Sequence, residues 1–314
     1  MASQNPLSAD FLFGHVKDGE SFHVPRFFHS IDPFGIVDAH GHVAIPQPFA
    51  LEGGGIRLLN TGNPNIDNMI APLDFRITRF MIVELIAAVI CIIIFTWLAH
   101  KIAKGGSPKG RMWNFFETFL VFLRDDVAEP AIGHHDAHKF LPFIWSVFFF
   151  VLGCNLLGMV PWLGSPTGSL AVTGTMALIA FGATVGAGMM KMGPLGFMFA
   201  QVPHMDLPWY MFPLKIGIFC IEIAGLFIKH FVLAVRLLAN MFAGHMVLAV
   251  ILAFVGAVGI YTQSYFNPLF IGVSVASIFG AVALSLLELF VAFLQAYIFA
   301  FLTALFIGMA VHPH

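Results

Sequence analysis

Charged residues are scarce in this sequence: they make up 10% of its 314 residues, while hydrophobic residues make up 59%. Soluble domains carry roughly a quarter charged residues, so this composition excludes an ordinary water-soluble fold and indicates a membrane protein. The formal net charge of -2 at pH 7 provides no basic surface for nucleic acid. We therefore expect membrane lipid, and no nucleic acid, among the partners of this chain.

Cysteine is equally rare, and no nucleotide-binding loop is present. Cys91, Cys154 and Cys220 stand within apolar stretches without CxxC spacing, which is typical of buried thiols and not of disulfides or metal ligands. The phosphate-binding pattern GxxxxGK[ST] does not occur, so we expect no nucleotide chemistry, no cofactor and no metal on this chain. The first residues fit neither a signal peptide nor an Arg-rich transit peptide, which favours a bacterial protein over an imported one.

Long apolar runs occupy most of the chain, and their lengths predict the fold class. Shorter runs at about 80–99, 140–162 and 170–190 are each close to the ~20 residues that cross a bilayer. Two longer runs, about 209–260 and 267–311, would measure ~75 Å and ~65 Å as helices, against ~30 Å of hydrocarbon. We predict an all-α polytopic membrane protein with about five membrane helices, the last two strongly tilted or sharply bent.

The remaining segments are predicted to lie outside the hydrocarbon. Residues 1–75 form a polar leader, expected to contain loops and short helices, and residues 76–314 form the membrane domain. Lys101 and Lys104 follow the first span, so the positive-inside rule places the leader outside the cytoplasm. Residues 112–128 alternate apolar and charged side chains, as an amphipathic interfacial helix does.

Two smaller patterns concern the connections between helices. Gly182 and Gly186 form a GxxxG surface, from which we expect close helix packing. Three prolines predict a connector over residues 192–208.

The few charges within the long apolar runs follow a helical period. Four of them recur at intervals of seven and share one narrow stripe of a helix: Lys215, Glu222, Lys229 and Arg236. Asn240 lies one turn beyond Arg236 and extends this stripe, whereas His245 faces the opposite side. In the last run, Glu288 and Gln295 are also seven apart and share a face.

Ionisable side chains inside a bilayer usually mark ion pathways, because leaving them unpaired there costs several kcal/mol. The plainer alternative is structural ion pairs and snorkelling ends, which we expect for Lys215. Arg236 keeps its charge under almost any conditions, whereas Glu222, His245 and Glu288 can bind and release protons. This division of roles predicts two separated half-paths with a gate between them.

Three motifs resemble one known family. The run from Val235 to His245, VRLLANMFAGH, resembles the R-L-x-x-N-x-x-A-G signature of subunit a of F-type ATP synthases. The stretch from Glu288 to Thr303 resembles the last helix of that family, and Asn155 to Pro161, NLLGMVP, resembles its N-L-x-G-x-x-P element. The resemblance covers about residues 80–311.

The resemblance implies a stator subunit beside a rotating ring of c subunits, whose carboxylates exchange protons with two offset half-channels. Proton flow would thereby be coupled to rotation and to ATP synthesis on other subunits, with this chain itself non-catalytic. The last two helices would lie along the ring. The motif positions imply these roles: Arg236 as the essential gate charge, Asn240, His245, Glu288 and Gln295 in the outer half-channel, and Glu222 in the inner one.

The resemblance also implies partners and a location. The partners would be the c-subunit ring, the b-subunit peripheral stalk and the rest of the ATP synthase. The location would be the bacterial inner membrane, with the N-terminus outside and the C-terminus in the cytoplasm, or alternatively the mitochondrial inner membrane.

The sequence departs from many members of the family at two places. Many bacterial members carry a carboxylate where His245 stands and a histidine where Glu288 stands, so the pair is exchanged but its chemistry is kept. Lys229 and His230 occupy the place of a Lys-Pro pair.

Two other classes of membrane protein compete with this interpretation. His134, His135 and His138 with Asp136, together with His40 and His42, suggest a metalloenzyme, although no HExxH motif completes such a site. A secondary transporter would also place charges at the membrane midplane, but we find no inverted repeat.

Overall fold

Five long helices dominate the computed structural model and confirm the predicted all-α polytopic class. Each is long and apolar enough to cross a membrane. The structure describes residue 19 and residues 21–23, 42–47, 77–103, 110–160, 163–200, 212–262 and 267–312.

The three shorter membrane helices match the shorter apolar runs. They are α4 (Arg79–Ala103), α7 (His134–Gly158) and α8 (Leu170–Ala200). The second span was predicted at about residues 140–162, and the helix that contains it, α7, begins earlier, at His134, and ends at Gly158. The polar residues from His134 to Lys139 are thus part of the helix and form its first turns.

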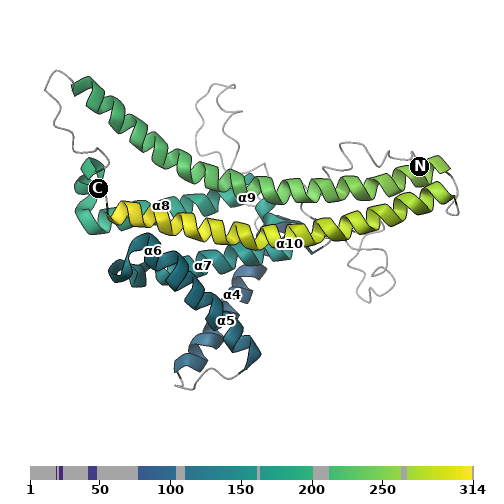
Figure 1. Cartoon of the computed structure of the whole chain (residues 1–314), viewed down its shortest axis with the longest axis horizontal. Coiled ribbons are helices and arrows are strands. Elements are labelled where there is room, and N and C mark those ends of the chain that lie inside the picture. Colours follow the sequence, from purple (N-terminus) through teal and green to yellow (C-terminus); the bar gives the residue numbers. More distant parts are fainter. Residues whose placement is uncertain are drawn as a thin grey trace.

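The two longest helices run side by side over much of their length (Figure 1). They are α9 (Phe212–Thr262, 51 residues) and α10 (Pro268–Val311, 44 residues), and each is a continuous helix, without a reversal. Asn267 caps α10 by accepting a hydrogen bond from the backbone N–H of Leu269 at 3.0 Å, with Pro268 in the first turn. Helices of ~65–75 Å cannot cross ~30 Å of hydrocarbon upright, so both must lie obliquely.

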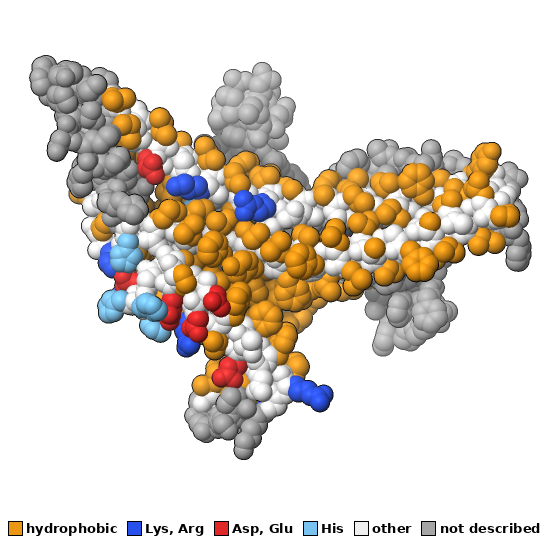
Figure 2. Space-filling view, in the orientation of Figure 1, with side chains coloured by type: hydrophobic (Ala, Val, Ile, Leu, Met, Phe, Trp, Pro, Cys, Tyr) orange, Lys and Arg blue, Asp and Glu red, His pale blue; other side chains and the backbone are white. Residues whose placement is uncertain are grey.

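The predicted amphipathic segment is helical throughout. It consists of α5 (Arg111–Phe122), a π-helical stretch (Leu123–Ala128) and α6 (Glu129–Ile132). Its apolar side chains Leu123 and Val127 are fully buried against the membrane helices, whereas Asp125 and Asp126 are exposed. Figure 2 shows acidic, basic and histidine side chains gathered on this side of the molecule, while hydrophobic side chains cover most of α9 and α10.

The core lies where α7, α8, α9 and α10 meet, and glycine permits its closest approach. A Cβ atom on Gly308 of α10 would lie 1.9 Å from the backbone oxygen of Ala131 in α6, so the two backbones touch. The prediction for the GxxxG pair was wrong: within the described residues, a Cβ on Gly182 or Gly186 would have no neighbour within 4 Å. In the part of the chain that the structure describes, neither glycine forms a close contact with another helix.

The close contact in α8 involves a different glycine. A Cβ on Gly188 would lie 2.3 Å from the ring of Phe197. Gly193 has φ 77°, a left-handed conformation that interrupts the helix and folds the following turn back. The predicted connector at 192–208 is therefore helical as far as Ala200, and its remaining residues lie outside the described ones.

The described part of the leader contains two short strands, β1 (Ser21–His23) and β2 (His42–Ala44), paired antiparallel. This pairing corrects the expectation of loops and short helices for these residues. The rest of the leader lies outside the described residues.

Candidate functional site

Arg236 lies near the middle of α9 with its side chain exposed. The adjoining stripe of the helix, to one side of Arg236, is buried and includes Leu233, Leu237 and Met241. Within the described part of the chain, no carboxylate forms an ion pair with Arg236 and no group hydrogen-bonds its guanidinium. An unpaired charge on an apolar helix indicates that its counter-charge comes from outside this chain.

His245 and Glu288 form a close, largely buried pair between α9 and α10. Nδ1 of His245 lies 2.5 Å from Oε1 of Glu288, and the glutamate side chain is 9% exposed. His245 therefore faces away from Arg236, as the nine-residue spacing predicted. The two residues that sequence reasoning assigned to one relay are thus brought into contact.

A third helix fixes the orientation of the imidazole. Nε2 of His245 donates to the backbone oxygen of Gly158, at the end of α7, at 2.9 Å. A carbonyl oxygen only accepts, so Nε2 carries a hydrogen and Nδ1 is the atom that shares a proton with Glu288. A single proton can occupy the space between Nδ1 and Oε1. It is held either by the carboxylic acid of Glu288, which then donates to a neutral imidazole, or by the imidazolium of His245, which then donates to a carboxylate.

Gly244 leaves the space that the carboxylate occupies. A Cβ at this position would lie 2.9 Å from Oε1 of Glu288 and 3.1 Å from its Cδ. The glycine beside His245 therefore has a steric role in the pair.

Asn240 and Gln295 form a second polar pair between the same two helices. Nδ2 of Asn240 donates to Oε1 of Gln295 at 2.7 Å, and Gln295 is 1% exposed. Asn240 thus turns toward α10, whereas Arg236 stays exposed one turn earlier. Asn240 lies one helical turn beyond Arg236, as the spacing predicted, and its side chain is bound to Gln295 at the edge of the buried face.

Asn155 of α7 belongs to the same polar region and was not chosen as a site residue from the sequence. It is fully buried, and its Nδ2 donates to the backbone oxygen of Ala292 in α10 at 3.2 Å. The feature of the sequence that could have identified Asn155 as a site residue is its position as a polar side chain inside an apolar span.

Glu222 and Lys229 lie apart from both pairs, on the first half of α9. Glu222 is half-buried and Lys229 is exposed, and neither contacts Glu288 or His245. The side chain of Lys215 lies outside the described residues.

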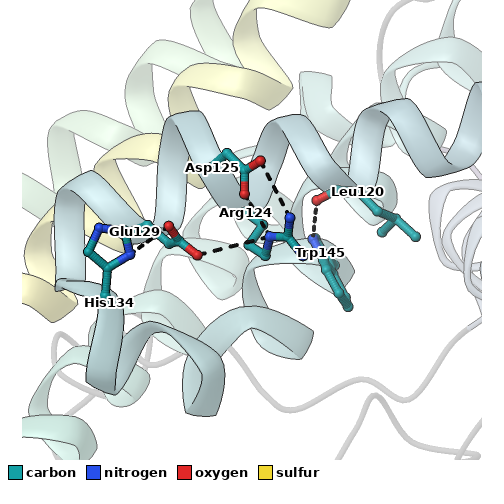
Figure 3. A network of polar contacts seen from close by, with 6 residues as sticks. All are labelled: Leu120, Arg124, Asp125, Glu129, His134 and Trp145. Carbon is teal, nitrogen blue, oxygen red and sulfur yellow. Dashed lines mark hydrogen bonds and ion pairs between the residues drawn. The ribbon is translucent and has the colours of Figure 1, made fainter.

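A separate polar network joins the amphipathic segment to α7 (Figure 3). Nε of Arg124 lies 2.6 Å from Oδ1 of Asp125, and Oε2 of Glu129 lies 2.7 Å from Nδ1 of His134. The hydrogen bond from Arg124 lowers the pKa of the Asp125 carboxyl and raises that of the guanidinium. Nε1 of Trp145 donates to the backbone oxygen of Leu120 at 3.2 Å, which fastens α5 to α7.

Residues of the candidate metal cluster form ion pairs with other side chains. Asp136, whose side chain is 6% exposed, forms ion pairs with Lys139 at 3.2 Å and with Lys191 of α8. His134 contacts Glu129, and no group of three His, Cys, Asp or Glu side chains gathers as a metal site among the described residues. His40 lies outside them.

These features define a polytopic helical membrane protein that holds one ionisable pair and one amide pair between its last two helices and exposes an arginine on the first of them. The family model described as "ATP synthase A chain" matches residues 81–308. A protein of Myxococcus xanthus named ATP synthase subunit a is 40% identical over 246 residues, which are 77% of this chain and 76% of that protein.

Two further relatives carry the same name. The one from Chloroherpeton thalassium is 39% identical over 284 residues, 88% of this chain and 77% of that protein. The one from Anaeromyxobacter sp. is 34% identical over 317 residues, 96% and 70% of the two chains. The chain therefore belongs to the ATP synthase subunit a family, and so to the membrane part of the F-type ATP synthase.

Proposed function

We propose that this chain conducts protons along two offset half-channels against a ring of c subunits, and so couples proton flow to rotation. The observation that carries the proposal is the exposed Arg236, which has no counter-charge among the described residues, on the same helix as the buried pair of His245 with Glu288. A ring carboxylate passing this face would supply the missing counter-charge.

The outer half-channel would use both polar pairs. His245 and Glu288 share one proton between them. When a second proton binds to this pair from the outer side, the pair releases a proton toward the ring. Gln295 lies seven residues beyond Glu288, ~10 Å along α10, which is too far for one direct hydrogen bond. Oδ1 of Asn155 and Nε2 of Gln295 are buried polar atoms without a partner among the described residues, the environment in which buried water binds.

Arg236 would act as the gate between the half-channels. Its fixed positive charge attracts a deprotonated ring carboxylate and repels a free proton, so protons would have to travel on the ring. Glu222, half-buried on the first half of α9, would belong to the inner half-channel.

The wider assembly follows from the same proposal. We place the chain in the bacterial inner membrane with residues 1–75 and the N-terminus outside and the C-terminus in the cytoplasm. Its partners would be the c ring, the b-subunit stalk and the remaining ATP synthase subunits.

ATP-driven proton pumping in inverted membrane vesicles tests the gate. Arg236→Ala should abolish pumping while the complex still assembles, since the substitution removes a side chain that forms no hydrogen bond or ion pair with the described residues. Lys229→Ala is the matched control, because Lys229 is also exposed and lies seven residues earlier on the same side of α9. Normal pumping by an assembled Arg236→Ala complex would remove Arg236 from the mechanism.

A further inference from the structure

His230 is the polar member of a buried stripe that is otherwise apolar. It lies on α9 six residues before Arg236 and is 3% exposed, and the stripe continues through Leu233 and Leu237, which are fully buried. A histidine in this position is a costly choice for packing alone, because its two ring nitrogens need partners where water is excluded.

Both ring nitrogens of His230 have such partners. Nδ1 lies 2.9 Å from the backbone oxygen of Leu226, and since that oxygen only accepts, Nδ1 carries a hydrogen. Nε2 lies 3.3 Å from Oγ1 of Thr184 on α8, which is fully buried. The single hydroxyl hydrogen of Thr184 is shared between two acceptors, the backbone oxygen of Ala180 at 2.9 Å and Nε2 of the neutral ring, and its contact with Nε2 links α8 to α9.

Aromatic rings hold the imidazole in place on two other sides. The ring of Phe181, on α8, meets it edge-on at 5.2 Å between centroids, and the ring of Phe306, on α10, lies 4.8 Å away. Three helices therefore determine where His230 points.

This link and the Asn240–Gln295 hydrogen bond lie on either side of Arg236. His230 is bound to α8 six residues before it, and Asn240 is bound to α10 four residues after it. Each residue of a helix turns the side-chain direction by ~100°, so fixing the rotation of α9 at two such points fixes the direction of Arg236 between them.

We propose that His230 and Thr184 are positioning residues, whose hydrogen bond fixes the rotation of α9 so that Arg236 faces the ring carboxylates. The proposal rests on the gating function proposed above for Arg236.

Two substitutions at Thr184 separate the hydrogen bond from packing. Thr184→Val keeps the shape and removes the hydroxyl, and Thr184→Ser keeps the hydroxyl and removes a methyl group. We expect Thr184→Val to lower protons pumped per ATP hydrolysed by about threefold, and by at most about twentyfold, the range that interhelical hydrogen bonds in membranes account for. Thr184→Ser should pump like the unaltered complex. The reverse order, or equal pumping by both variants, would overturn the proposal.

A second pair covers the case in which Thr184→Val fails to assemble. His230→Phe keeps an aromatic ring between Phe181 and Phe306, and His230→Gln keeps a side-chain hydrogen-bonding group. Gln should retain more coupling than Phe if the hydrogen bond positions Arg236, and Phe should retain more if only packing matters, which would refute the proposal.

Arg236→Ala, measured alongside, distinguishes the two proposals. If it pumps normally, the gating function fails whatever the Thr184 variants do. If it does not pump while Thr184→Val is fully coupled, only the positioning role fails.

Discussion

The contact between His245 and Glu288 predicts a strong functional coupling between the two residues. His245→Ala or Glu288→Ala should each slow proton delivery from the outer side, because either change leaves the other group without the partner that shares its proton. The double substitution should lower the rate of proton delivery little more than the more harmful single substitution, because either single change already removes the relay.

The size of the coupling follows from the geometry. Nδ1 and Oε1 lie 2.5 Å apart, and the Glu288 side chain is 9% exposed, so the two groups form a close ionisable pair with little solvent screening. A charge-assisted contact contributes about 1.5–3 kcal/mol. At about 1.4 kcal/mol per tenfold change in rate, the product of the two single losses should exceed the double loss by about tenfold to about 150-fold.

The assay is the initial rate of ATP-driven acidification of inverted vesicles, normalised to assembled complex. Glu288→Gln serves as the isosteric comparison, because it keeps a hydrogen-bonding side chain but cannot take up a proton. We expect it to be as slow as Glu288→Ala. An interaction term below about 0.5 kcal/mol would mean that the two residues act independently, and the relay would then be refuted.

Two glycine substitutions test the packing around this region. Gly244→Ala places a methyl 2.9 Å from Oε1 of Glu288 and should displace the flexible carboxylate, so pumping should fall while the thermal midpoint of the complex stays nearly constant. Gly308→Ala places a methyl 1.9 Å from the backbone oxygen of Ala131, so α10 and α6 must separate, at a cost of about 1–3 kcal/mol or more, and the thermal midpoint should fall. Gly225→Ala, with open space around it, should change neither quantity, and an equal effect at all three positions would contradict both predictions.

Helical periodicity predicted the faces of the site residues but not their partners. The interval between Glu288 and Gln295 placed them correctly on one face, and the nine-residue spacing correctly opposed His245 to Arg236. The hydrogen bond from Asn240 to Gln295 could not be predicted, because it depends on how closely α10 approaches α9. The hydrogen bond from His245 to the backbone oxygen of Gly158 could not be predicted either. Every residue has a carbonyl group, and only the packing of the helices determines which one lies beside the imidazole.

Packing motifs were less informative than polar ones. Gly182 and Gly186 suggested a helix contact, yet the close approach uses Gly308, which has no partner glycine at the GxxxG spacing. Shape complementarity between two backbones depends on both surfaces, and a pattern in one helix contains only half of that information. The link between His230 and Thr184 was hidden for the same reason, because the two residues are 46 positions apart.

The exposed side chain of Arg236 has a consequence for the biogenesis of the complex. An arginine at the centre of a membrane helix costs about 2.5–3.5 kcal/mol during insertion, and nothing within the described part of this chain offsets that cost. A subunit inserted alone therefore presents a charged face to lipid, and its free energy falls when a carboxylate-bearing neighbour docks there. The charge that serves translocation in the finished complex would thus make the unassembled subunit less stable in the membrane. The subunit would become stable there once its partner has docked.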